Sequence, residues 1–73
     1  MIKWYSPKDK MPKIGDEIIC FDYRDNITPV TMGKAILNKG LRVIEIEYGF
    51  PIVSYTHWAY VDDFNFPSEV KNE

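Results

Sequence analysis

The chain has 73 residues, enough for one domain, but a chain of this size buries only about 60% of the surface that its unfolded form exposes. One cysteine and one histidine exclude an internal disulfide and a four-ligand Cys/His zinc site. The net charge of −2, with mixed signs, gives no overall bias toward nucleic acid, and no apolar run approaches the roughly 20 residues that span a bilayer.

Small domains usually need a further source of stability. The aromatic content of 15% predicts a dense aromatic core, and self-association stays open as a second source. The single cysteine suits a reducing cytosol, and the first residues lack the charged and apolar regions of a secretory signal. We therefore expect a protein of the cytoplasm.

The first 15 residues favour an irregular segment, because two prolines and a glycine disfavour a long helix or a central strand. Ser6 as an N-cap and Pro7 at the first helical position predict one short helical turn over Ser6–Asp9. Trp4 precedes this turn, and we expect it to pack inward and anchor the loop.

Four strands are predicted in chain order, at Glu17–Tyr23, Pro29–Leu37, Leu41–Tyr48 and Ile52–Tyr60. The first is apolar on both faces and is therefore expected at the centre of a sheet. Gly33 predicts a bulge or a close backbone approach in the second strand. The Asn38-Lys39-Gly40 turn predicts a hairpin with a positive φ at Gly40.

Alternation in the third strand separates a core face from a solvent face. The core face is expected to carry Ile44, Ile46 and Tyr48, and the solvent face Val43, Glu45 and Glu47. After the fourth strand, Phe64 and Phe66 are expected to fold back onto the domain, and residues 68–73 to be a disordered tail. The fold prediction is a single all-β domain over residues 1–67. It is a four-stranded antiparallel meander, forming a curled sheet or an SH3-like half-barrel.

The stretch Ile52–Tyr60 is the predicted centre of a binding surface, because it holds the histidine and several aromatic rings. In an extended strand Trp58 and Tyr60 share one face with Thr56, and Tyr55 and His57 share the other. Rings on the face away from the core would suit a stacked base or an aromatic-rich protein. The predicted ligand-binding residues are Trp4, Tyr5, Arg24, Arg42, Tyr55, His57, Trp58 and Tyr60, with Lys34 as a further cation. The competing interpretation is that these rings fill the core.

His57 is the one side chain whose type suits proton transfer near neutral pH. A Cys20–His57 pair oriented by Asp22 would make a nucleophile, but a cysteine within an apolar strand is usually a buried hydrophobe. Asp62 and Asp63 could join His57 as metal ligands, although adjacent aspartates usually form a solvated turn. We expect His57 to hold a hydrogen-bond network with the N-terminal loop, with no metal and no cofactor.

Three segments carry a family resemblance: Trp4, Ser6, Asp9, Met11-Pro12 and Gly15 near the start, the strand Glu17–Cys20, and Thr56-His57-Trp58. They resemble a family of small phage and prophage domains of unknown function with the pattern Trp-x-Ser-x-x-Asp-x-Leu-Pro-x-x-Gly and a late Thr-His-Trp. Met11 stands where the family has Leu, and Ala59-Tyr60 replaces its proline-rich ending. The resemblance implies a mobile-element origin and a β-rich fold, and it implies no activity.

These observations predict a non-enzymatic binding protein of phage or prophage origin, acting in the cytoplasm of the bacterial host. It would act against host defence, either by sequestering a nucleotide signal or by blocking a host protein, and we expect a homo-oligomer. The alternatives are a self-associating assembly accessory and an enzyme centred on His57.

Overall fold

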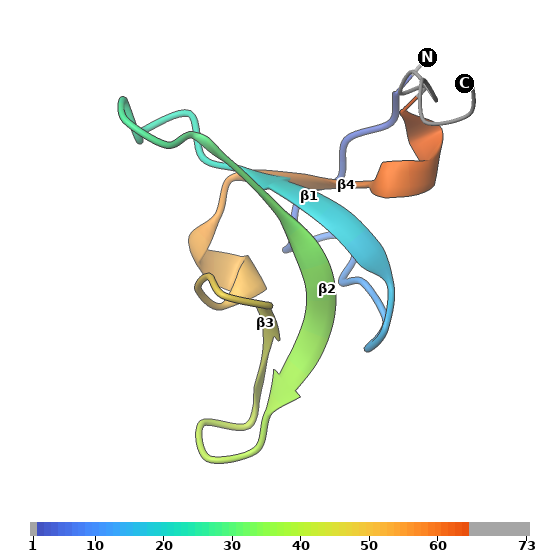
Figure 1. Ribbon diagram of the computed structural model, residues 1–73, viewed down its shortest axis with the longest axis vertical. Coiled ribbons are helices and arrows are strands. Elements are labelled where there is room, and N and C mark those ends of the chain that lie inside the picture. The colour runs from blue at the N-terminus through green and yellow to red at the C-terminus, as the bar shows by residue number, and fades with distance from the viewer. Residues whose placement is uncertain (1, 65–73) are drawn as a thin grey trace, which may run out of the picture.

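The computed structural model describes residues 2–64, which form one curled antiparallel sheet of four strands (Figure 1). The strands are β1 (Glu17–Phe21), β2 (Val30–Asn38), β3 (Val43–Ile46) and β4 (His57–Tyr60). Two short 3₁₀ turns, η1 (Ile52–Ser54) and η2 (Val61–Asp63), precede and follow β4. The all-β fold and the curled four-stranded sheet are confirmed.

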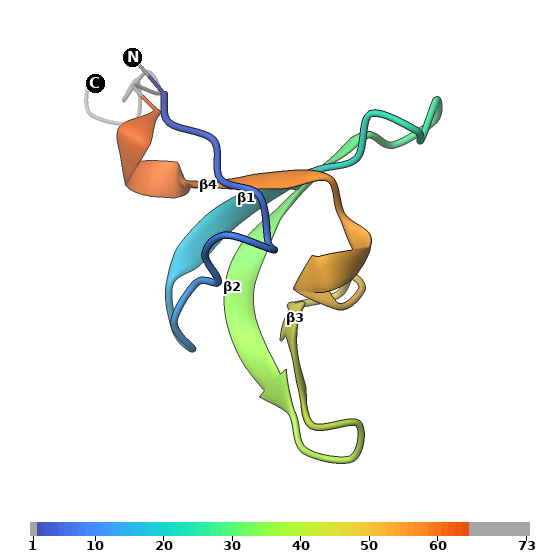
Figure 2. The same cartoon turned by 180° about the vertical axis from the view of Figure 1, so that it is seen from behind.

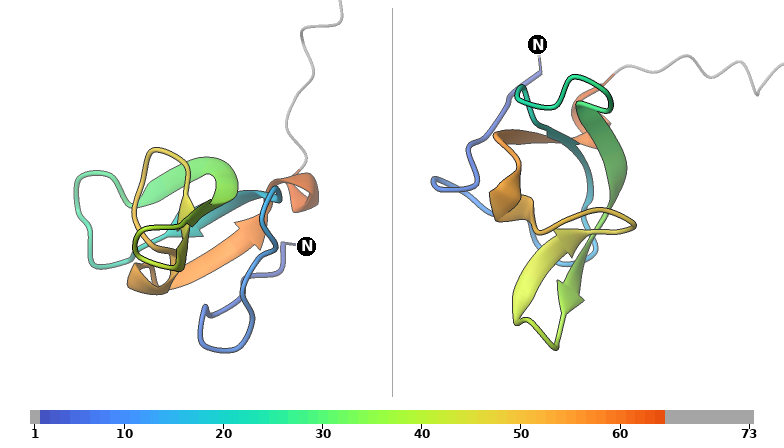
Figure 3. Two further views of the ribbon diagram at one scale, coloured as in Figure 1. Left: turned by 90° about the horizontal axis from the view of Figure 1, so that it is seen from below. Right: turned by 90° about the vertical axis from the view of Figure 1, so that its left-hand side faces the viewer.

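The strand order is β3-β2-β1-β4, so the fourth strand returns to lie beside the first. This is the arrangement of a Greek key, in which a long connection follows two hairpins. In a simple meander β4 would lie beside β3, so the connectivity departs from that expectation. Figures 2 and 3 show the long, bent β2 and the connection through η1 that crosses the concave side of the sheet. As predicted, β1 is central and pairs with both β2 and β4.

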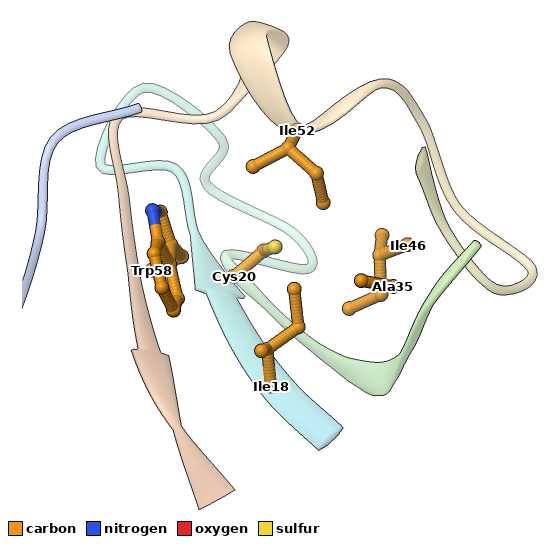
Figure 4. Packing of buried hydrophobic residues seen from close by; sticks show 6 residues of the cluster. All are labelled: Ile18, Cys20, Ala35, Ile46, Ile52 and Trp58. Atoms are coloured by element: carbon orange, nitrogen blue, oxygen red, sulfur yellow. The ribbon is translucent and has the colours of Figure 1, made fainter. Parts of the chain in front are cut away.

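The concave side of the sheet holds the core. Its fully buried side chains point toward one another from the four strands and from η1 (Figure 4); they are Ile18, Cys20, Ala35, Ile46, Ile52 and Trp58. Tyr5, Met11, Ile44, Tyr55 and Tyr60 pack around this cluster. Most of the chain's tyrosines therefore serve the core, as the competing interpretation of the aromatic residues expected.

Trp58 ties the N-terminal loop to the core. Its indole Nε1 donates a hydrogen bond to the Lys10 carbonyl oxygen at 2.8 Å, and its ring centroid lies 4.9 Å from that of Tyr5. Tyr5 and Trp58 also exchange both backbone hydrogen bonds, at 2.8 and 2.9 Å. The Lys10 ammonium sits 4.7 Å from the Tyr5 ring centroid. The loop thus covers the outer edge of β4, which would otherwise be open.

The fourth strand is shorter than predicted, because residues 52–54 form η1 instead of an extended segment. Pro51 enters this turn with φ −54°, and its carbonyl oxygen accepts bonds from the Ser54 amide at 2.9 Å and the Ser54 hydroxyl at 2.6 Å. The tight turn lets Ile52 insert its side chain into the concave core. Burial of Ile52 therefore overrides the β propensity of this stretch.

The third strand also ends earlier than predicted, because a tight turn follows it. Tyr48 has φ 62° and is 99% exposed, so its expected place in the core is wrong, while Ile44 and Ile46 do face the core. Gly49 follows in a crowded position where an added Cβ would lie 2.6 Å from Ile46 Cγ2. The chain needs this tight turn to reach Pro51, which bridges back to Glu45.

The two glycine predictions have different outcomes. Gly33 lies close to the neighbouring backbone, since a Cβ there would meet the Glu47 carbonyl oxygen at 3.2 Å. In the β2–β3 hairpin the positive φ falls on Arg42, at 58°, and the prediction for Gly40 is wrong. The Asn38 side chain accounts for this, because its Oδ1 accepts from Leu41 N at 3.1 Å while its carbonyl accepts from Arg42 N at 2.7 Å.

The N-terminal segment follows its prediction in part. Asp9 N and Lys10 N both donate to the Ser6 carbonyl, at 2.9 and 3.0 Å, which makes the expected single turn. Trp4 does not pack inward; it lies on the convex side against Phe21 and Phe64, with centroid distances of 6.0 Å to each. Phe64 thus folds back as expected. The predictions for Phe66, for the tail at 68–73 and for the end of the domain at residue 67 lie outside the described residues.

The two tryptophans allow a matched test of this packing. Trp58→Phe removes the bond to the Lys10 carbonyl and leaves a cavity in the core, so we expect a loss of about 2 kcal/mol or more in the free energy of unfolding. Trp4→Phe, on the half-exposed convex side, should cost less than about 1 kcal/mol. Urea unfolding followed by circular dichroism measures both, and equal losses would contradict the role given to Trp58.

Candidate functional site

The convex side of the sheet carries a second set of apolar and aromatic side chains. The strand register places Phe21 between His57 of β4 and Val30 of β2, and Ile19 between Ala59 and Met32. Continuing the Tyr5–Trp58 pairing by one residue in each direction places Trp4 beside Ala59 and Ser6 beside His57. Residues from distant parts of the chain therefore form two rows across one surface.

An open hollow of about 360 Å³ lies on this surface between Trp4, Phe21 and His57, and its walls are almost entirely apolar. We call it the apolar hollow. Trp4 and Phe21 are held at an interplanar angle of 56°, and Phe21 and His57 at 44° with 6.4 Å between centroids. Trp4 is 40% exposed. Ring surfaces in this arrangement can receive a planar group.

A second hollow, of about 310 Å³, shares His57 with the first. We call it the polar hollow, and it is lined by Ser6, Pro7, Lys8, Tyr23, Arg24, Tyr55, Thr56 and His57. Two cationic side chains and several hydroxyl groups belong to this lining, and no carboxylate does. The electrostatic character of the two hollows therefore differs on the two sides of one imidazole ring.

The hydrogen bonds of Thr56 determine which ring nitrogen of His57 carries a proton. The single hydroxyl proton of Thr56 goes to the Phe21 carbonyl oxygen at 2.8 Å, so Thr56 Oγ1 can only accept from His57 Nδ1 at 3.1 Å. Nδ1 therefore carries a proton, and Nε2 is the ring nitrogen without a hydrogen bond to residues 2–64. The bond to Thr56 replaces the network with the N-terminal loop that the sequence predicted.

Arg24 lies at the rim of the polar hollow, and its side chain makes three hydrogen bonds there. Its Nε donates to Asp22 Oδ1 at 2.8 Å, and one terminal nitrogen donates to Asp22 Oδ2 at 3.1 Å and to the Ser54 carbonyl at 2.7 Å. The hydrogen bonds from Arg24 lower the pKa of Asp22, and the same pair raises the pKa of Arg24. Both groups are charged at neutral pH, and the second terminal nitrogen of Arg24 makes no hydrogen bond with the described residues.

The structure brings four of the eight predicted ligand-binding residues together around the two hollows: Trp4, Arg24, Tyr55 and His57. Tyr5, Trp58 and Tyr60 belong to the core and its margin. Arg42 lies in the β2–β3 turn, at the end of the sheet far from His57 (Figure 1). Tyr55 packs against the core, and its hydroxyl accepts from Phe50 N at 3.2 Å, so Tyr55 and His57 do not share a face.

Six lining residues of the two hollows are absent from the predicted site: Ser6, Pro7, Lys8, Phe21, Tyr23 and Thr56. Phe21 and Lys8 show the physical reason. Phe21 was placed on a strand that looked apolar on both faces, and only the register shows that its ring adjoins His57. Lys8 was treated as part of a loop, and only the pairing of that loop with β4 brings it to the polar hollow. Neither position carries a local pattern that marks it.

Cys20 and His57 do not form a catalytic pair, because Cys20 faces the concave core while His57 lies on the convex side. Burial raises the pKa of the Cys20 thiol to about 12, which leaves it protonated and poorly nucleophilic. Among residues 2–64 no group of three or more His, Cys, Asp or Glu side chains is placed to hold a metal ion.

The sequence matches no family model, no curated protein and no solved structure. Within the described part of the chain, no helix has the length and apolar character needed to cross a membrane. The interpretation of the site therefore depends on its geometry.

Thr56 should contribute more to stability than a threonine whose hydroxyl lies at the surface. Thr56→Val removes the donor to Phe21 and the acceptor for His57, so we expect a loss of about 1–2 kcal/mol in the free energy of unfolding. Thr28→Val is a matched control, because the Thr28 hydroxyl makes only an exposed 3.4 Å contact with Asp25. Thermal unfolding of both variants provides the measurement, and an unchanged melting temperature for Thr56→Val would exclude this role.

Burial of the Cys20 thiol predicts how stability and thiol reactivity depend on pH. Burial raises the pKa of the Cys20 thiol in the folded protein from the ordinary thiol value of 9.0 to about 12, so its contribution to stability is complete below about 9 and is lost as pH rises toward 12. At pH 8 we expect slow alkylation by iodoacetamide in the folded protein and rapid alkylation in urea. Equal rates in the two conditions would show that Cys20 is accessible.

Proposed function

We propose that the protein is a non-enzymatic binding protein that uses the convex surface around His57 to capture a ligand with a planar ring. The observation that carries this proposal is the apolar hollow between Trp4, Phe21 and His57. Trp4 and Phe21 make ring contacts outside the concave core, and that core already contains Trp58 and its tyrosine neighbours. Exposed rings that the core does not require are suited to stacking.

A nucleotide signal of the host is the ligand class that we favour, and a host protein with an exposed aromatic side chain is the rival. We place the protein in the cytoplasm of a bacterial host and assign it to a phage or prophage, on the basis of the sequence resemblance described above. In this setting, a small protein whose cysteine is buried away from His57 would act by sequestration, as a factor against host defence.

Self-association is a second candidate function, and the edge of β2 favours it. Peptide groups along β2 point alternately toward β1 and toward β3: Ala35 N donates to Asp16 on the β1 side, and the Lys34 carbonyl accepts from Glu47 N on the β3 side. By this alternation the peptide groups of Val30 and Met32 point to the β3 side. Since β3 pairs only with Ala35–Asn38 among the described residues, these groups lie on an open edge. Their side chains are 53% and 58% exposed. An edge of this kind can pair with a second copy of the chain.

Native mass spectrometry of the freshly purified full chain tests both candidates. We expect an integer number of chains with the added mass of one small molecule per site, because the ligand is captured during expression. Trp4→Ala should lose this added mass because it removes one wall of the apolar hollow. Phe50→Ala should keep it, since Phe50 is an exposed ring elsewhere on the molecule.

The outcomes separate the candidates. Added mass that Trp4→Ala retains would contradict the assigned site. Oligomers without added mass would favour self-association, and Met32→Lys should then shift the mass to the monomer. A monomer without added mass would contradict both candidates. Circular dichroism of each variant confirms that its sheet is intact.

A further inference from the structure

The polar hollow contains hydrogen-bond donors that make no hydrogen bond with residues 2–64. The Lys8 ammonium makes no salt bridge with the described residues, and the Ser6 hydroxyl accepts from Lys8 N at 3.2 Å, which leaves the Ser6 hydroxyl proton available. Arg24 has one unused terminal nitrogen, as described above.

These donors surround a space with no carboxylate in its lining. The carboxylate that pairs with Arg24, that of Asp22, accepts two hydrogen bonds from it, at 2.8 and 3.1 Å. Asp22 therefore offsets part of the Arg24 charge while it fixes the guanidinium in position, and the Lys8 charge is not offset in this way. An anionic group can enter without displacing an internal ion pair.

The polar and apolar hollows meet at His57, which lines both. Ser6 lies beside His57 on the side of the polar hollow, and Phe21 pairs with His57 on the side of the apolar hollow. A single ligand can therefore place a flat apolar part against Trp4 and Phe21 and an anionic part beside Lys8. The combined volume of the hollows lies in the usual range for sites that bind small molecules.

We propose that the polar hollow is a phosphate subsite and that the ligand of this surface is a nucleoside phosphate. The base lies in the apolar hollow, and the phosphate accepts hydrogen bonds from Lys8, Ser6 and Arg24. This inference rests on the proposed function, because it assumes that the apolar hollow receives a ring. The inference goes beyond the proposed function in one respect: the ligand carries an anionic group, which distinguishes it from neutral planar molecules.

Nuclear magnetic resonance of the ¹⁵N-labelled full chain tests the subsite. The probes are adenosine, guanosine, cytidine and uridine, their monophosphates, and inorganic phosphate, all at constant ionic strength. We expect at least one monophosphate to shift the Trp4 indole signal together with the amides of Lys8, Arg24 and His57. The matching nucleoside should shift the Trp4 indole and bind more weakly, and inorganic phosphate should shift only the amides.

Lys8→Ala and Lys39→Ala form a matched pair, since Lys39 is an exposed lysine in the distant β2–β3 turn. Lys8→Ala should weaken binding of the monophosphate about three- to tenfold, as loss of one exposed charge-assisted contact predicts, and Lys8→Glu should weaken it further. Lys39→Ala should leave the affinity unchanged, and neither lysine should affect binding of the nucleoside.

Three results would overturn the phosphate subsite while leaving ring binding intact. They are equal affinities for a nucleoside and its monophosphate, equal effects of the two alanine variants, and shifts of the Trp4 indole without shifts at the polar hollow. Inorganic phosphate that binds as tightly as every monophosphate would show that the two hollows do not share one ligand. If no nucleoside or monophosphate shifts the Trp4 indole, both this inference and the nucleotide form of the proposed function fail.

Discussion

The structure depends on the hydrogen bond between the Trp58 indole and the Lys10 carbonyl oxygen. A fully buried tryptophan must find an acceptor for its N–H group, and here that acceptor belongs to the N-terminal loop. The bond joins residues 48 positions apart and adds to the backbone bridge between Tyr5 and Trp58. The loop that this contact holds in place provides Trp4 to one hollow and Lys8 to the other. The core contact therefore positions the surface that we propose for binding.

The sheet separates two sets of aromatic residues by side. Trp58, Tyr5 and Tyr60 form ring contacts on the concave side, with centroid distances from 4.9 to 5.9 Å. Trp4 and Phe21 lie on the convex side. Ile19 and Ala59 lie on the same face and are buried. Because the concave side already supplies a closed core, the convex rings can remain partly exposed without loss of the fold. This division separates the rings that fill the core from the rings that line the apolar hollow.

His57 connects these features because its position is fixed from two directions. The Thr56 hydroxyl fixes the protonation of Nδ1, and the neighbouring Phe21 fixes the side of the sheet on which the ring lies. The ring then borders an apolar hollow and a polar hollow with available cations. A histidine with one assigned nitrogen and one available nitrogen is suited to contact both parts of an amphipathic ligand. Cys20 is in the concave core, so it does not act with His57 as a nucleophile and base.

The sequence by itself determined the all-β class, the central first strand, the turn at Ser6, and the core positions of Ile44 and Ile46, because these follow from local periodicity and turn chemistry. Tertiary structure alone decided that β4 lies beside β1, that Ile52 leaves the strand to fill the core, and that Trp4 lies outside it. These outcomes depend on which distant segments pair, and alternation within one strand carries no information about its partners. Only half of the predicted site residues lie together around the two hollows, because strand pairing and not local pattern decides which residues become neighbours. Lys8 and Phe21 reach the hollows only through this pairing.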